Sequence, residues 1–220
     1  MIILNLKTYK ESTGKDGIKL VEAINNIYKL NPEVAKYIYI SPAMVDLSMI
    51  KMLYPHLNII GQHVDNKKAG STTGWTPAET LVRNGIEYSM LNHAEHRVWS
   101  DNIVQDINDI QSSGLKLIIP CESLDEAKIL LEAKPYAIAL EDKNLIGTGQ
   151  SITSMKPDSV KEFIEYCKGK TKLIIGAGVS TGEDVRSGLE LGAEGFVLAS
   201  AFVKAADPEA KARELVAPFL

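Results

Sequence analysis

Cysteine, net positive charge and long apolar runs are all scarce in this chain. Two of its 220 residues are cysteines, Cys121 and Cys167, which lie far apart and have no neighbouring ligand pattern. Their scarcity argues against a structural metal site and favours a reduced, cytoplasmic setting. The net charge is -4, with Lys and Arg scattered among Asp and Glu, so the clustered cations that nucleic-acid binding needs are missing.

No apolar stretch approaches the roughly 20 residues that a bilayer span needs. The chain opens on the strand-like Met1-Ile2-Ile3-Leu4 with no basic segment or cleavage site, so neither membrane insertion nor export is expected. The length suits one domain with a large core and leaves a second domain cramped. Without a linker or low-complexity tract, residues 1–220 are expected to form a single domain.

Short apolar runs alternate along the chain with amphipathic stretches of helical period. Several runs are apolar throughout, which is typical of parallel strands covered on both faces. The expected strands are Ile2–Leu6, Tyr37–Ile40, Asn58–Gln62, Tyr88–Leu91, Lys116–Ile119, Tyr136–Leu140, Lys172–Ile175 and Gly195–Ala199. The expected helices are Gly17–Lys29, Val45–Leu53, Pro77–Asn84, Asp101–Ser113, Ser123–Glu132, Pro157–Lys168, Gly182–Leu191 and Pro208–Phe219.

The residues at the helix ends agree with this assignment. Gly114 and Gly192 follow helical runs, where a left-handed cap is favoured, and Ser123 with Glu126 resembles a capping box. Eight strand–helix units in this length predict an α/β fold, a single-domain (β/α)₈ barrel. The rival, a doubly wound open sheet, would carry a glycine-rich fingerprint after the first strand, where Asn5-Leu6-Lys7 stands instead.

In such a barrel, the active groups project from the carboxyl ends of the strands. This chain places Asn5 and Lys7 after the first strand, His93 and Glu95 after the fourth, and Glu141 after the sixth. A carboxylate, an imidazole and an ammonium at one mouth can abstract a proton, polarise a carbonyl and hold negative charge.

Small residues follow the last two strands, as Gly176-Ala177-Gly178-Val179-Ser180 and Ala199-Ser200. Backbone N–H groups and a helix start at these places would bind a phosphate dianion. The loops after the seventh and eighth strands are also the usual phosphate site of this barrel. Together the groups predict proton transfer on a small phosphorylated carbonyl compound, with no cofactor and no metal.

Each of these residues also has a plainer interpretation. Alone, His93 would be a structural histidine, Glu141 a surface or capping carboxylate, and Lys7 a solvated head on a buried stem. All of them fall at predicted carboxyl strand ends, and none comes from the opposite face. That shared position favours the functional interpretation.

Seven motifs in order give the chain a resemblance to a known family. They are Asn5-Leu6-Lys7; Gln62-His63; Gly70-Ser71-Thr72-Thr73-Gly74; Asn92-His93-Ala94-Glu95-His96-Arg97; Glu141 with Leu145-Ile146-Gly147-Thr148-Gly149; Gly176-Ala177-Gly178-Val179-Ser180; and Leu198-Ala199-Ser200. With these motifs the chain resembles the triosephosphate isomerases of glycolysis and gluconeogenesis, specifically the shorter archaeal type.

The resemblance implies a role for each residue of the predicted site. Glu141 would be the general base that shuttles a proton between C1 and C2 of the substrate. His93 would be a neutral electrophile on the carbonyl oxygen, Lys7 would stabilise the enediolate, and Asn5 would orient the substrate. Glu95 would pair with Lys7. The phosphate would be held by Ile146, Gly147, Gly178, Ala199 and Ser200, with Ser180 close by.

Matching of proton affinities favours a neutral imidazole at His93, because it must hand a proton between two oxygens and recover it. We expect the helix starting near Asp101 to depress its pKa.

The resemblance also implies a lid and an assembly. Residues 142–149 would close over the substrate, but Asp142-Lys143-Asn144 stand where proline usually follows the catalytic glutamate. Loop Val64–Trp75 would reach a neighbouring subunit, with Thr73 near the partner's active site, in a homodimer; a tetramer stays open. Trp75 would anchor that contact or cap its own barrel. Cys121 is expected to be a small buried hydrophobe rather than a redox group.

Two other functions compete with triose-phosphate isomerisation. Another phosphate-binding barrel enzyme, such as a phosphoribosyl isomerase or a synthase of the tryptophan and histidine pathways, would place its acid and base carboxylates on other strands and need a wider pocket. A barrel kept only for binding or scaffolding would have no need of Lys7, His93 and Glu141 together.

Overall fold

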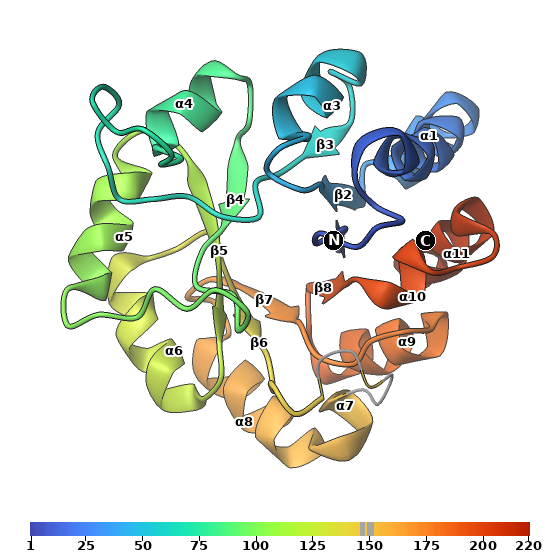
Figure 1. The fold of residues 1–220 in the computed structure, drawn as a ribbon. Coiled ribbons are helices and arrows are strands. Elements are labelled where there is room, and N and C mark those ends of the chain that lie inside the picture. The colour runs from blue at the N-terminus through green and yellow to red at the C-terminus, as the bar shows by residue number, and fades with distance from the viewer. Residues whose placement is uncertain (146–147, 149–151) are drawn as a thin grey trace.

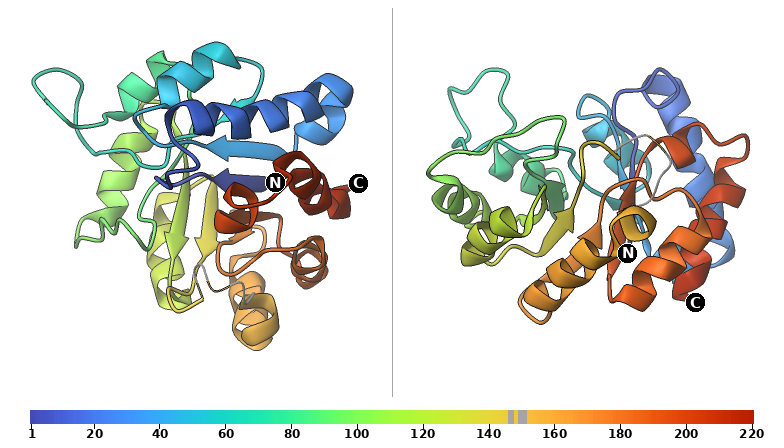
Figure 2. Two further views of the ribbon diagram at one scale, coloured as in Figure 1. Left: turned by 45° about the vertical axis from the view of Figure 1, so that its right-hand side comes forward. Right: turned by 90° about the horizontal axis from the view of Figure 1, so that it is seen from below.

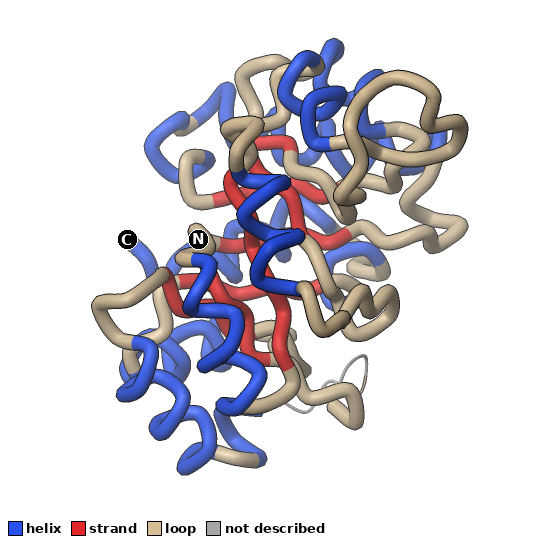
Figure 3. Tube along the Cα trace, turned by 90° about the vertical axis from the view of Figure 1, so that its left-hand side faces the viewer, coloured by secondary structure: helices blue, strands red, loops and turns tan. Residues whose placement is uncertain are grey.

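The computed structural model describes residues 1–145, 148 and 152–220. Within them, one sheet of eight parallel strands runs in the order β3-β2-β1-β8-β7-β6-β5-β4. A ring of helices surrounds this sheet, as Figure 1 shows, and Figure 3 shows the strands as the inner wall. The predicted (β/α)₈ barrel is therefore confirmed.

The eight predicted strands are all present, with ends that differ by a few residues. Their bounds are β1 Ile2–Asn5, β2 Ile38–Ser41, β3 Asn58–Ile59, β4 Tyr88–Met90, β5 Lys116–Cys121, β6 Ala137–Leu140, β7 Lys172–Ile175 and β8 Gly195–Leu198.

The barrel closes between β3 and β4 through a single residue, Gly61. Its N–H donates to Tyr88 O at 2.9 Å and its carbonyl accepts from Met90 N at 2.9 Å. A Cβ at this position would lie 2.6 Å from Ser89 Oγ, so only glycine allows the two strands to approach this closely. Gly61 lies within the predicted strand Asn58–Gln62, whereas β3 itself ends at Ile59.

The eight predicted helices are also present, and three short ones were not predicted. The bounds of the predicted helices are α1 Gly14–Leu30, α3 Leu47–Leu53, α4 Ala78–Arg83, α5 Ile103–Gln111, α6 Leu124–Leu130, α8 Pro157–Cys167, α9 Gly182–Leu191 and α11 Pro208–Val216. The additional short helices are α2 Pro32–Ala35, α7 Ile152–Met155 and α10 Ser200–Val203, and the 3₁₀ turns are η1 Leu131–Ala133 and η2 Ala217–Phe219. Helices of one turn are too short to show a period in sequence.

The helix caps follow the sequence in part. Gly114 and Gly192 adopt φ of 91° and 104°, as expected of left-handed caps. Ser123 accepts a hydrogen bond from Glu126 N, but the Glu126 carboxylate accepts from Glu122 N instead of returning to Ser123. The prediction of a reciprocal box at Ser123 was therefore wrong, because the preceding turn brings Glu122 N to the carboxylate first.

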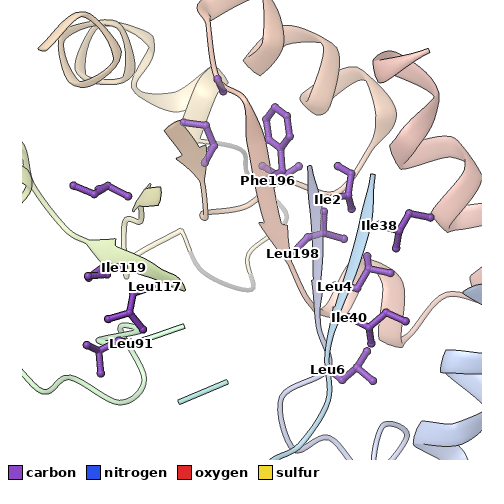
Figure 4. Packing of buried hydrophobic residues seen from close by; sticks show 14 of the residues in the cluster. Ile2, Leu4, Leu6, Ile38, Ile40, Leu91, Leu117, Ile119, Phe196 and Leu198 are labelled. Atoms are coloured by element: carbon purple, nitrogen blue, oxygen red, sulfur yellow. The ribbon is translucent and has the colours of Figure 1, made fainter. Parts of the chain in front are cut away.

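Two apolar layers hold the barrel. Register pairs Leu4 with Ile40 and with Leu198, so side chains of β1, β2 and β8 stand side by side and pack beneath the helices, as Figure 4 shows. The other layer fills the barrel interior, with Ile3, Ile60, Met90, Ile118, Ala137, Ala139, Ile174 and Val197 all buried. No helix in the described part of the chain is long and apolar enough to cross a membrane.

Candidate active site

The loop after β1 presents Lys7 in a strained backbone conformation. Its φ is 49°, in the left-handed region that residues other than glycine seldom adopt. Two amides hold it there: Lys7 N donates to Asn5 Oδ1 at 3.0 Å, and Gln62 Nε2 donates to Lys7 O at 3.1 Å. Buried Asn5 thus uses its carbonyl oxygen locally and leaves its amide nitrogen for another partner.

The Lys7 ammonium points to the loop after β4. Its Nζ lies 2.6 Å from Glu95 Oε1, and the Lys7 side chain is only 14% exposed whereas that of Glu95 is 54% exposed. The pair expected between these residues is present. Glu95 orients the ammonium without burying its own charge, so the cation stays available at the rim.

His93 is held in one orientation by the backbone that precedes and follows it. Asn92 has φ of 72° and is fully buried, and its side chain accepts from Val98 N and donates to Pro120 O. Glu95 N donates to His93 Nδ1 at 3.1 Å. Because Nδ1 is the acceptor, the neutral ring carries its proton on Nε2.

Burial of the ring is the largest cause that lowers the pKa of His93, and the nearby Lys7 charge adds to it, against the opposite effect of Glu95. A neutral imidazole at neutral pH is the result, as the chemistry requires. Helix α5 begins at Ile103, two residues beyond Asp101, with Asn102 as its N-cap. Desolvation alone accounts for the direction of the pKa shift, and the contribution of the helix dipole stays a prediction.

Glu141 follows β6 and is 1% exposed. Its Oε2 accepts from Ala94 N at 3.3 Å, and its Oε1 lies 3.4 Å from His93 Nε2. Within the described residues, Oε1 has no hydrogen-bond partner. Gly176 lies directly against the carboxyl group, since a Cβ there would come within 2.7 Å of Glu141 Cγ.

Burial raises the pKa of Glu141 to about 8, although the Ala94 N–H and the Lys7 charge both oppose this shift. Desolvation disfavours the ionised carboxylate, which makes that carboxylate a stronger base when it forms. A buried carboxyl group with one unpartnered oxygen, beside a neutral imidazole, is the arrangement of an acid–base pair.

A cleft at the carboxyl rim joins these groups to an anion cradle. Lys7, His93 and Asn5 line it on one side. The other side is formed by the loops after β7 and β8, with Gly176, Gly178, Val179, Ser180, Leu198, Ala199, Ser200 and Ala201. The N-terminus of α10 faces this cleft, and the first N–H groups of a helix have no partner within it. Such N–H groups suit a phosphate dianion.

The predicted phosphate residues are placed differently from one another. Gly178, with φ of 70°, Ala199 and Ser200 line the cleft. Ser180 also lines it, but its N–H and its hydroxyl both donate to Asp184 Oδ2, at 2.9 and 3.2 Å. Asp184 forms a reciprocal capping box with Thr181 that starts α9, so in this arrangement Ser180 helps to hold the loop, and its place beside the phosphate stays a prediction. Ile146 and Gly147 lie outside the described residues.

Some residues of the site were not predicted from the sequence. Tyr9 and Ala201 line the cleft, and Gln62, which we had placed in a motif without a role, holds Lys7. Tyr9 and Ala201 follow predicted site residues closely, and that neighbourhood was the available signal. No signal in the sequence joins Gln62 to Lys7, which lies 55 positions earlier.

Cys121 and Trp75 are not part of the lining of this cleft. Cys121 is fully buried, and burial raises the pKa of its thiol well above the usual range, as expected of a packing residue. Trp75 is 52% exposed, with Lys67 Nζ 4.8 Å from its ring centroid. Its loop projects from the body of the molecule, as Figure 2 shows in teal. In the described part of the chain, no three His, Cys, Asp or Glu side chains gather closely enough to hold a metal ion.

A buried carboxyl group, a neutral imidazole and an oriented ammonium beside an anion cradle define a phosphate-binding barrel of the acid–base class. A family model described as triosephosphate isomerase matches residues 1–216, and the chain belongs to that family.

Curated archaeal relatives agree. The chain is 34% identical over 216 residues to the triosephosphate isomerase of Thermoplasma volcanium, with 98% of each chain covered. It is 35% identical over 219 residues to that of Methanocaldococcus jannaschii, with 98% of each covered. It is 35% identical over 220 residues to that of Cenarchaeum symbiosum, covering 98% of this chain and 96% of the relative.

Proposed function

We propose that this protein is a triose-phosphate isomerase that interconverts dihydroxyacetone phosphate and D-glyceraldehyde 3-phosphate. One observation carries the proposal: Lys7 and His93 share a cleft with the N-terminus of α10, and the Glu141 carboxyl group adjoins it across Gly176. The cleft therefore presents an anion cradle and proton-transfer groups to the two ends of one short substrate. Family membership supports the same activity.

The geometry supports a division of labour. A phosphate dianion bound by the backbone around Gly178 and Ser200 places the carbon chain toward Lys7 and His93. Glu141 takes a proton from C1 of the ketose, and the electron pair of the broken C–H bond moves into an enediolate. His93 Nε2 gives its proton to the oxygen on C2 and takes up the proton of the C1 hydroxyl group, while Lys7 Nζ stabilises the negative charge. Glu141 then returns the first proton to C2, the C1 oxygen becomes the aldehyde carbonyl, and the product is the aldose.

In this arrangement Glu141 does not line the cleft, and its Oε2 is bonded to Ala94 N. We infer that the carboxyl group leaves Ala94 to reach the substrate. Ionisation is then favoured by the Lys7 charge, which already acts to lower the Glu141 pKa. The base is therefore held neutral and withdrawn until a substrate occupies the cleft.

The wider context of the protein is also proposed. Residues 1–220 form one catalytic domain, since the apolar layers run around the whole barrel. A homodimer is supported by the loop Val64–Trp75, on which Thr73 and Trp75 are exposed, and a tetramer would build on the same contact. A cytoplasmic location is supported by the two cysteines, which are both free.

Replacing Glu141 with Ala tests the function. We expect the isomerisation rate from glyceraldehyde 3-phosphate, measured in a coupled assay, to fall by about 10³-fold or more, because the variant lacks the base. The far-UV spectrum and a single cooperative thermal transition should remain, because the site is at the rim. Near-wild-type turnover by the variant would show that another group is the base and would refute the assignment.

A further inference from the structure

The side chain of Asp142, the residue that follows the proposed base, makes three contacts, two with Asn144 and one with Lys156. Its Oδ1 accepts from Asn144 N at 2.9 Å and from Asn144 Nδ2 at 3.1 Å. Its Oδ2 lies 2.5 Å from Lys156 Nζ. Leu145 N donates to Asp142 O at 2.9 Å, which closes a turn. The backbone just beyond Glu141 is therefore held by side-chain and main-chain contacts together.

Lys156 connects Asp142 to the anion cradle. Lys156 N donates to Ile152 O at 2.8 Å at the end of α7, and Ile152 N donates to Ala177 O at 3.2 Å. Ala177 lies between Gly176, which contacts the Glu141 carboxyl group, and Gly178, which lines the cleft. A short chain of contacts thus runs from the residue after the base to the loop that faces the phosphate.

The position of Asp142 matters because Glu141 is fixed on only one side by the sheet. Glu141 N donates to Cys121 O at 2.9 Å, which continues the ladder of β6. On its other side, the chain direction is set by the contacts of Asp142. A small displacement of a catalytic group costs rate steeply, so the residue that sets this direction affects the chemical step.

We propose that Asp142 and Lys156 are positioning residues, whose ion pair fixes the Glu141 carboxylate relative to the bound phosphate. The inference rests on the proposed isomerase function. It assigns no contact with substrate to either side chain, and acts on the reaction through Glu141 alone.

The charges around Asp142 agree with a formed ion pair. The Lys156 ammonium is the largest cause that lowers the pKa of Asp142, with the Asn144 N–H adding to it, so the carboxylate is ionised at neutral pH. The Asp142 side chain is 12% exposed and that of Lys156 is 52% exposed. The next residue, Lys143, lies 3.8 Å from Glu122 and does not compete for Asp142. An ion pair this open adds little to global stability.

A double-mutant cycle tests the proposal. Lys156→Met and Asp142→Asn each remove one charge with little change of shape, and the asparagine can still accept from Asn144 N. We expect each variant to lower kcat about fivefold to tenfold with KM within about twofold, and the double variant to lose no more than either single variant. Inhibition by inorganic phosphate should be unchanged, because the cradle is intact.

Lys161→Met is the matched control, since Lys161 is an exposed lysine of α8 for which no ion pair occurs among the described residues. It should leave kcat at the wild-type level. Thermal midpoints of all variants should agree within about 2 °C, which separates positioning from unfolding.

The outcomes distinguish the two proposals. If wild-type protein fails to isomerise glyceraldehyde 3-phosphate, the proposed function fails. If wild-type protein is active and Lys156→Met retains full kcat, only the positioning role is overturned. Additive losses in the double variant would also overturn it, because they would show that the two charges act independently.

Discussion

The amino and carboxyl ends of this barrel differ in the kind of side chain that fills them. At the amino end, Tyr39, Tyr88 and Tyr136 close the interior with edge-to-face contacts, with ring centroids 5.7 and 4.9 Å apart. Beneath them the interior is filled by apolar side chains such as Ile118. At the carboxyl end, Lys7 adopts an unfavourable φ and Glu141 is buried with one oxygen unpartnered among the described residues. The amino end therefore stabilises the fold, whereas the carboxyl end costs free energy of folding.

The difference follows from what each end must do. Aromatic and aliphatic side chains gain free energy simply by leaving water, and they need no exact partner. A buried carboxyl group and a strained lysine cost free energy, and they persist only where the surrounding structure holds them. Variants at the carboxyl end should therefore lower activity, whereas variants among the buried apolar side chains should lower stability.

Lys7→Met should have a large effect at the rim, second to that of Glu141→Ala. Removing the ammonium while keeping its apolar stem should lower kcat/KM by about 10²- to 10³-fold, because the enediolate loses a charge partner. Lys134→Met is the matched control, since Lys134 has the same φ of 49° but follows η1. Steady-state kinetics on both variants would contradict the comparison if they lost activity equally.

Ile118→Ala should lower the stability of the protein instead of acting on the chemical step. Ile118 is fully buried in the barrel interior, and the variant should lose about 2–5 kcal/mol of unfolding free energy in denaturant titrations. Ile129→Ala, at a position that is 41% exposed, should lose less than about 1 kcal/mol. Similar losses at the two positions would show that the interior layer does not carry the stability assigned to it.

Glu141→Gln should have a smaller effect, which is on thermal stability and depends on pH. The folded protein raises the pKa of Glu141 from 4.5 to about 8, so the folded state retains a proton that the unfolded state has lost. Wild-type stability therefore falls as pH rises through that window, and glutamine removes the cost. We expect the thermal midpoint of the variant to exceed that of wild type by several degrees near pH 9, and by little near pH 5. A difference independent of pH would argue against a buried, neutral carboxyl group.

Much of the fold could be predicted from short-range patterns in the sequence. Continuous apolar runs such as Gly195–Ala199 predicted parallel strands because both faces of each strand are covered. The short helices α7 and α10 were missed, since a helix of one turn shows no period in the sequence.

The site residues could be predicted from the sequence where they stand at the ends of strands. Lys7, His93 and Glu141 were found in this way, because parallel strands bring their carboxyl ends to one rim. The partners Gln62 and Lys156 were not found, because their contacts with Lys7 and Asp142 join positions that no local spacing relates.

The order of strands and helices follows from the pattern of residues along the chain, and with it the rim on which the acid–base groups meet. The chemical states of those groups follow from the packed structure: which nitrogen of His93 carries the proton, how far burial raises the pKa of Glu141, and that Ser180 contacts Asp184. The physical reason is that periodicity is a property of neighbours along the chain. Desolvation and hydrogen bonding instead depend on every group that packs around an atom.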